Sequence, residues 1–226
     1  MYNIEKLSKN IAYNLKDELR LEDEKTEIIE YGLHALIHMF ISVLLVVIFG
    51  YIFNVMIESL IISFTISIFR RSSGGAHART SLNCAIIGVL IAVIPSSLLS
   101  KIVPNINYVI ALGIIIFTVS LLITYKLAPV DTPNKPIKKL EKIKRLKKAS
   151  IITLVIYMLI IIINLLLYKA NSSEILLIYS ICIYVGVVWQ VFTLTNTGHY
   201  IINLIDTFLI KVLSFWKEGS KNEKDK

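Results

Sequence analysis

Long apolar stretches almost free of charge constrain the fold of this 226-residue chain more than any other feature. A helix of about 20 apolar residues crosses the hydrocarbon core of a bilayer and satisfies its own backbone hydrogen bonds there. One stretch, residues 33–69, carries Glu58 as its single charge and is long enough for two spans with a turn near Asn54. The sequence predicts an all-α, polytopic membrane protein that forms a single domain over residues 1–226. Its expected six transmembrane helices are about 33–53, 56–69, 82–100, 105–125, 150–168 and 175–195.

The distribution of basic residues predicts the orientation of these spans. With six spans and the N-terminus inside, all of the 24 Lys and Arg residues except Lys101 and Lys169 fall on the cytoplasmic side. This is the bias that the positive-inside rule describes. It also explains the net charge of +8 without a nucleic-acid partner. We therefore expect a multi-pass protein of the cell membrane with both termini in the cytoplasm.

Two amphipathic segments flank the spans. Residues 3–20 repeat apolar side chains at helical spacing and predict a helix, which either lies on the inner leaflet or packs on the bundle as a cytosolic cap. Residues 200–216 have a broad apolar face and predict an interfacial helix, followed by a polar, disordered tail at 217–226. The 14-residue second span is short and leaves polar surface that a homodimer would cover. Membrane lipid is thus an expected partner, and a homodimer is compatible with the pattern.

The basic loop between the second and third spans contains a His77/Cys84 pair. A cysteine and a histidine are the minimal set for nucleophilic acyl chemistry, since the imidazole takes the thiol proton and the thiolate attacks a carbonyl. On one straight helix the two side chains would lie about 10 Å apart along the axis, beyond hydrogen-bond reach. The helix must therefore be interrupted, and Gly74-Gly75 provides the backbone freedom that brings His77 back toward Cys84.

Cys84 lies close to the start of the third span, where Thr80 or Ser81 is the expected N-cap. In a first helical turn, the helix dipole favours a thiolate and unpaired backbone N–H groups can bind an oxyanion. Positive potential favours a thiolate as well, and this loop carries Arg70, Arg71 and Arg79. The sequence assigns no third catalytic residue and leaves four candidates open, which are Ser81, Asn83, Glu58 and Asp131.

Other polar residues receive less specific interpretations. His34 and His38 are four residues apart, as metal ligands on one helix face would be, and Glu58 or His77 would have to complete a zinc site. A polar contact inside the bundle, with His34 lining the active site, is the favoured alternative, so no metal and no cofactor are expected. Cys182 lies in the middle of an apolar span and is expected to be a packed, inert thiol.

The loop 126–149 is strongly basic. It opens with three prolines and continues through Lys135, Lys138 and Lys139 into a run of further basic residues. Such a segment either anchors the protein on anionic lipid or binds an acidic peptide. Both interpretations place it on the cytoplasmic side.

Two motifs together resemble a known family. The pattern Arg70-Arg71-x-x-Gly74-Gly75-x-His77-Ala78 with Cys84, and the downstream segment A-P-V-D-T-P-N-K-P at 128–136, look like accessory gene regulator protein B (AgrB). AgrB is the membrane cysteine endopeptidase of Gram-positive quorum sensing, and the resemblance covers nearly the whole chain.

The resemblance implies that His77 and Cys84 are the catalytic pair. It implies cleavage of a short precursor peptide, AgrD, with release of its acidic C-terminal tail. A thioester to Cys84 would remain until a cysteine of the peptide displaces it and closes a thiolactone ring. Two other functions stay open on the residues alone: a peptide exporter or transporter without covalent chemistry, and an acyltransferase that uses Cys84.

Overall fold

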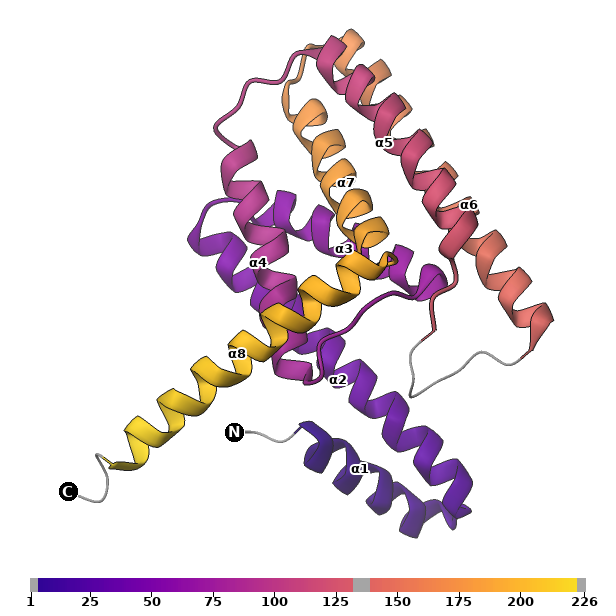
Figure 1. Ribbon diagram of the computed structural model, residues 1–226, viewed down its shortest axis with the longest axis vertical. Coiled ribbons are helices and arrows are strands. Elements are labelled where there is room, and N and C mark those ends of the chain that lie inside the picture. The colour runs from indigo at the N-terminus through magenta and orange to yellow at the C-terminus, as the bar shows by residue number, and fades with distance from the viewer. Residues whose placement is uncertain (1–3, 132–138, 223–226) are drawn as a thin grey trace.

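A computed structural model describes residues 4–131 and 139–222, with side chains up to residue 212. The described residues form eight helices and no strand, which confirms the all-α prediction. Figure 1 shows their arrangement. The helices are α1 (Ile4–Leu19), α2 (Asp23–Ile52), α3 (Met56–Ser73), α4 (Ser81–Leu99), α5 (Ile106–Leu127), α6 (Leu140–Asn171), α7 (Ile175–Phe192) and α8 (Asn196–Asn222).

Five of these helices are long and apolar enough to cross a membrane, namely α2, α4, α5, α6 and α7. The chain is therefore a multi-pass membrane protein. Helix α3 occupies the place of the expected second span but differs from the five, because its 18 residues include Glu58, Arg70 and Arg71. It packs against α2, α4, α6 and α7, and it crosses behind α7 in the middle of the molecule (Figure 1). Its charges come at its two ends, so the apolar middle can be buried in the bundle.

Helices α3 and α7 make the most extensive contact in the fold and connect two apolar cores. One core lies among α3, α5, α6 and α7 around Phe69 and Leu177, and the other joins α2, α3, α4 and α7 around Ile62. Gly186 of α7 permits this contact, because a Cβ atom there would lie 2.7 Å from the side chain of Thr65. Small residues allow membrane helices to approach closely in this way. The loop after α3 therefore begins from a helix that is packed closely against α7.

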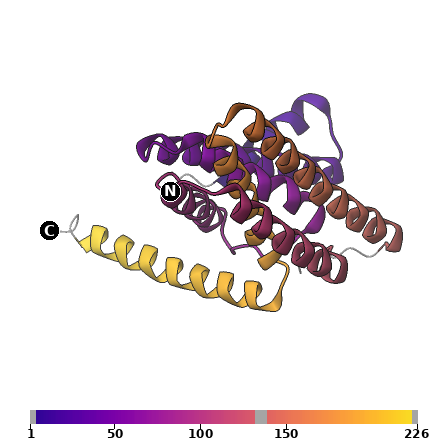
Figure 2. The same ribbon diagram turned by 90° about the horizontal axis from the view of Figure 1, so that it is seen from above.

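The two amphipathic segments are helical, as expected. Helix α1 packs along α2, with Ser8 and Ala12 buried and an ion pair between Lys16 and Asp23. Helix α1 thus packs on α2, and whether it also lies on the inner leaflet stays a prediction. Helix α8 packs against α4 at its start and then projects away from the other helices (Figure 2). It continues to Asn222, so residues 217–222 of the expected polar tail are helical, and residues 223–226 lie outside the described part of the chain.

The three interhelical connections that the sequence places on the cytoplasmic side, α3–α4, α5–α6 and α7–α8, are joined by backbone hydrogen bonds. The backbone N–H of Val130, after α5, donates to the carbonyl of Ser73 at the end of α3, at 2.9 Å. The N–H of Ala76, in the α3–α4 loop, donates to the carbonyl of Thr193 between α7 and α8, at 3.0 Å. The α3–α4, α5–α6 and α7–α8 connections therefore meet at one end of the bundle. The candidate catalytic residues lie at this meeting point.

Candidate active site

The helical conformation is interrupted between α3 and α4, as the spacing of the His77/Cys84 pair requires. Helix α3 ends at Ser73, and Gly74 and Gly75 adopt φ angles of +69° and +125°. Both angles lie in the region that favours glycine. A Cβ atom on Gly74 would lie 1.9 Å from the carbonyl oxygen of Val130, and one on Gly75 would lie 2.5 Å from Oγ1 of Thr193. The two glycines thus provide the turn and also make room for the neighbouring backbone.

Gln190 of α7 holds this turn from inside the bundle. Its side chain is fully buried. The amide nitrogen donates to Oγ of Ser73 at 3.0 Å and to the carbonyl of Gly74 at 2.7 Å, and the amide oxygen accepts from Nε of Arg70 at 3.1 Å. Each polar atom of Gln190 is therefore used, and the end of α3 and the first glycine are fixed to α7.

The positive charge of Arg70 acts on both members of the candidate pair. Its guanidinium interacts electrostatically with the Cys84 thiol and with the His77 ring. Within the described residues it forms no ion pair with a carboxylate, and burial lowers the pKa of its guanidinium. Arg71, by contrast, is exposed, and Arg79 pairs with Asp206. Of the three loop arginines expected to favour a thiolate, only Arg70 is free to act on the sulfur.

Cys84 lies in the first turn of α4, as expected. Oγ1 of Thr80 caps the helix by accepting from the N–H of Asn83 at 3.2 Å, and the carbonyl of Thr80 accepts from the N–H of Cys84 at 3.0 Å. The N–H groups of Ser81 and Leu82 have no acceptor within the described part of the chain. A helix N-terminus leaves such donors free for an anion. The half-buried thiol therefore lies on the same turn as two unpaired donors.

His77 lies on the loop, where it is partly exposed and partly covered by neighbouring protein. The protein packed around it, the Arg70 guanidinium and His38 lower the pKa of its imidazole to about 4. The ring is therefore neutral at neutral pH and can accept a proton. No hydrogen bond joins His77 to Cys84 among the described residues. Each of the two groups interacts electrostatically with Arg70, and they do not form an ion pair with each other.

The remaining predicted site residues lie in different places. Nε2 of His34 is 3.2 Å from Oγ of Ser81, so His34 reaches the start of α4. The described residues contain no group of three metal-ligand side chains, so His34 and His38 have no third partner for a zinc site. Lys139 is exposed directly before α6. Lys135 and Lys138 lie outside the described residues.

Sequence reasoning missed the role of two buried polar side chains. In the sequence, the one signal for Gln190 is that it is a single amide side chain within an apolar span. Asp206 of α8 is completely buried, and its carboxylate accepts from Nδ2 of Asn83 at 2.7 Å. The signal for Asp206 was an acidic residue within the broad apolar face expected at 200–216, where a carboxylate needs a partner.

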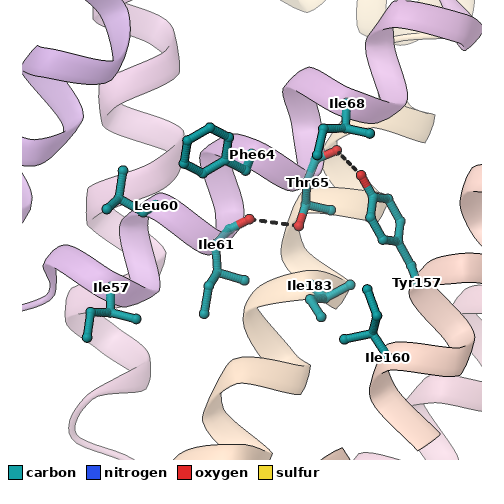
Figure 3. Close-up of a pocket in the computed structure, with 9 residues that line it drawn as sticks. All are labelled: Ile57, Leu60, Ile61, Phe64, Thr65, Ile68, Tyr157, Ile160 and Ile183. Atoms are coloured by element: carbon teal, nitrogen blue, oxygen red, sulfur yellow. Dashed lines mark hydrogen bonds between the residues drawn. The ribbon is translucent and has the colours of Figure 1, made fainter. Parts of the chain in front are cut away.

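A separate groove of about 300 Å³ lies between α3, α6 and α7 (Figure 3). Its polar groups already have partners, because Oγ1 of Thr65 donates to the carbonyl of Ile61 and the hydroxyl of Tyr157 donates to the carbonyl of Thr65. The other lining residues are aliphatic or aromatic. The groove includes neither His77 nor Cys84 and offers no group for catalysis. The lining residues are Ile57, Leu60, Ile61, Phe64, Thr65, Ile68, Tyr157, Ile160 and Ile183.

Comparisons with known proteins agree with the motifs. The family model described as accessory gene regulator B matches residues 8–194. AgrB-like protein 2 of Clostridium perfringens strain 13 is 41% identical over 215 residues, which cover 93% of this chain and 100% of the relative. An AgrB-like protein of Clostridium perfringens strain SM101 is similar to the same extent. No solved structure matches the chain significantly.

Proposed function

The chain belongs to the accessory gene regulator B family of quorum-sensing proteins, and on this premise we propose that it is a membrane cysteine endopeptidase acting on a small precursor peptide. Cys84 is the nucleophile and His77 the general base and acid. The precursor is AgrD-like, with an acidic C-terminal tail. The observation that carries the proposal is the placement of Cys84 on the first turn of α4, where the charge of the Arg70 guanidinium acts both on its thiol and on a neutral His77.

In the first half of the reaction, the Cys84 sulfur attacks a backbone carbonyl of the precursor while His77 takes the thiol proton. The developing oxyanion accepts hydrogen bonds from the free N–H groups of Ser81 and Leu82. The C–N bond then breaks, the leaving amine takes the proton from His77, and the C-terminal tail departs. A thioester between Cys84 and the N-terminal part of the peptide remains.

In the second half, a cysteine of the peptide attacks this thioester and loses its proton to His77. The C–S bond to Cys84 breaks, Cys84 leaves as a thiolate and regains a proton, and the peptide closes into a thiolactone ring. Exchange between a thiol and a thioester is nearly isoenergetic, whereas cleavage of an amide to give a thioester is uphill. Exclusion of water from the thioester is therefore essential, and a site between helices at the membrane surface favours it.

The acidic tail of the precursor would bind the basic residues at the beginning of α6. The N–H of Val130 ties the start of the α5–α6 connection to Ser73, directly before the glycine turn. The same connection leads into the basic beginning of α6, where exposed Lys139, Lys142 and Lys144 lie. Opposite charges would guide the tail toward the loop that carries His77. The basic connections also favour a cytoplasmic location for the site and for both termini.

Two other functions make different demands on the same residues. A transporter without covalent chemistry would not need a thiol at a helix N-terminus beside an arginine. An acyltransferase would use Cys84 and His77 but would not require the basic beginning of α6. The position of Cys84 therefore favours an enzyme, and the neighbouring basic segment favours a peptide substrate.

Co-expression with the precursor encoded beside the gene tests the proposal. We expect mass spectrometry to detect cleaved precursor and a peptide adduct on Cys84 in the wild-type protein. Cys84→Ala should abolish both, because it removes the nucleophile. Cys182→Ala is the matched control: this thiol is completely buried in α7, away from the loop, and its loss should leave cleavage intact. Cleavage by Cys84→Ala at the wild-type rate would refute the proposed chemistry.

A further inference from the structure

Among the side chains of helix α8 that the structure describes, up to residue 212, the carboxylate of Asp206 is completely buried and bonds to residues of the candidate active-site loop. Ile202 and Asp206, one turn apart, are both buried, with 3% and 0% of their surfaces exposed. Leu204 and Phe208, on the other side of this part of the helix, are exposed. The family model ends at residue 194, before this helix begins. Asp206 therefore lies outside the segment that carries the family's motifs.

The Asp206 carboxylate joins the two ends of the segment between His77 and Cys84. One oxygen accepts from Nδ2 of Asn83 at 2.7 Å, and Asn83 directly precedes Cys84 and is 1% exposed. The other oxygen accepts from the backbone N–H of Arg79 at 3.3 Å and lies 3.6 Å from its Nε. Arg79 is two residues after His77. This carboxylate thus joins the loop to the first turn of α4, in addition to the backbone N–H of Ala78, which donates to the Cys84 sulfur.

The burial of the Asp206 carboxylate makes its contacts with the loop energetically important. A carboxylate that is completely buried requires charge and hydrogen-bond partners, and the loss of one partner is strongly destabilising. Asp206 accepts two hydrogen bonds and forms one ion pair, all with residues 79–83. Displacement of the loop from α4 would leave the carboxylate buried and unpaired. The charge of Asp206 therefore opposes such displacement.

We propose that Asp206 is a positioning residue, which acts through Arg79 and Asn83 to fix the His77 loop against the Cys84 turn. The inference rests on the proposed function of His77 and Cys84, and it assigns to α8 a part in the reaction. Asp206 does not touch the substrate in this scheme. It sets the distance across which the imidazole and the thiol exchange a proton.

Variants of the full-length protein in membranes test this role. Asp206→Ala should lower kcat for precursor cleavage by about 100-fold with little change in KM, since a small misplacement of reacting groups has an effect of this size. Asp206→Ala and Asp206→Asn both remove the carboxylate charge that acts on Cys84, so faster labelling of Cys84 by a water-soluble maleimide in Asp206→Ala than in Asp206→Asn should report release of the loop. Cys182 should remain unlabelled, which shows that the bundle is intact. Asn203→Ala, an exposed polar position of the same helix, is the matched control and should change neither reading.

A charge swap distinguishes positioning from general stability. Asn83→Asp places two carboxylates face to face and should abolish cleavage. The double variant Asn83→Asp/Asp206→Asn restores a carboxylate–amide pair with the partners exchanged, and we expect it to recover much of the lost kcat. A swap without recovery, or Asp206→Ala with wild-type kcat and wild-type Cys84 labelling, would overturn the inference.

The two hypotheses can fail separately. If Cys84→Ala is inactive but Asp206→Ala is fully active, only the positioning role is wrong. If the wild-type protein cleaves no precursor, the proposed function is wrong. The labelling rates of Cys84 in the Asp206 variants still report in that case whether the carboxylate holds the loop.

Discussion

The hydrogen bonds of Gln190 lead to a quantitative prediction for Gln190→Leu. Leucine has a similar volume and suits an apolar span, so the helix itself should tolerate it. The substitution removes the donor to Ser73 Oγ and to the Gly74 carbonyl, and the acceptor for Arg70 Nε. Gln190 is fully buried, so water does not readily replace these contacts. The turn at Gly74 then loses its attachment to α7.

The expected effect follows from the kinds of bond that are lost. A neutral hydrogen bond contributes about 1 kcal/mol net, and one that involves a charged group contributes about 2 kcal/mol. Loss of two neutral bonds and one bond to a guanidinium therefore weakens the attachment by about 4 kcal/mol. Because 1.4 kcal/mol corresponds to a factor of 10, the held form of the loop becomes less populated by about three orders of magnitude relative to the released form. We expect kcat/KM for precursor cleavage to fall by at least about 100-fold.

Initial cleavage rates of a synthetic precursor, measured with the protein in lipid nanodiscs, provide the assay. Protection of Cys182 from maleimide reports on the integrity of the bundle. Asn164→Leu is a matched control in α6, because it removes a single hydrogen bond, at 3.2 Å to Ser180, away from the loop. We expect it to leave cleavage unchanged. Wild-type cleavage by Gln190→Leu, with Cys182 protected, would show that Gln190 does not hold the loop.

A variant that keeps part of the hydrogen bonding of Gln190 controls for general loss of the fold. Gln190→Glu keeps an acceptor for Arg70 but no longer donates to the carbonyl of Gly74. We expect its cleavage rate to lie between those of the wild type and Gln190→Leu. Equal rates for the Glu and Leu variants would contradict the additive contribution of the three bonds.

Two further predictions concern the loop itself. Because the pKa of His77 is lowered to about 4, the imidazole stays unprotonated well below pH 6.5, and the acid limb of the pH–kcat/KM profile that depends on His77 should lie near pH 4 to 5. Arg70→Gln removes one cause of this lowering and should move the limb to higher pH, and a limb at pH 6.5 in the wild type would contradict the assignment. Gly75→Ala should abolish cleavage, because its Cβ would lie 2.5 Å from Thr193 Oγ1 at a φ of +125°, whereas Gly88→Ala in α4 meets open space and should preserve it. Parallel rate measurements on the two alanine variants check this, and similar losses in both would refute the steric argument.

The sequence predicted the helices well where the physical signal is local. Uncharged apolar runs identified α4, α5 and α7 directly, and the seven-residue spacing of the candidate pair with Gly74-Gly75 indicated the break after α3. Helix α3 was harder to classify, because Arg70 and Arg71 belong to its last turn and not to the loop. Its central packing depends on tertiary contacts, which hydropathy does not report.

The supporting residues could not be predicted because their partners are distant in the chain. Asp206 binds Asn83 across 123 positions, and Gln190 binds Ser73 across 117. A lone amide in a span and a lone acid in an amphipathic helix indicate that a partner exists, but not which one. For the same reason, the sequence did not show which of the three arginines, all expected to favour a thiolate, has a carboxylate partner or faces outward. Arg79 is neutralised by Asp206 and Arg71 faces outward, so this role is left to Arg70.

The position of Arg70 has a consequence for both halves of the proposed reaction. Its charge has no carboxylate partner in the described part of the chain and is satisfied at Nε by the neutral amide of Gln190. The thiolate that forms as His77 takes the Cys84 proton is the anion that this charge can stabilise, and Arg70 also disfavours the protonated form of His77. When the thioester forms, that anion disappears and the guanidinium is again unpaired. Displacement of Cys84 by the cysteine of the peptide restores the thiolate, and a thiolate that is stabilised departs more readily. Arg70 should therefore assist the departure of Cys84 in ring closure as well as its attack, which links the two steps through one charge.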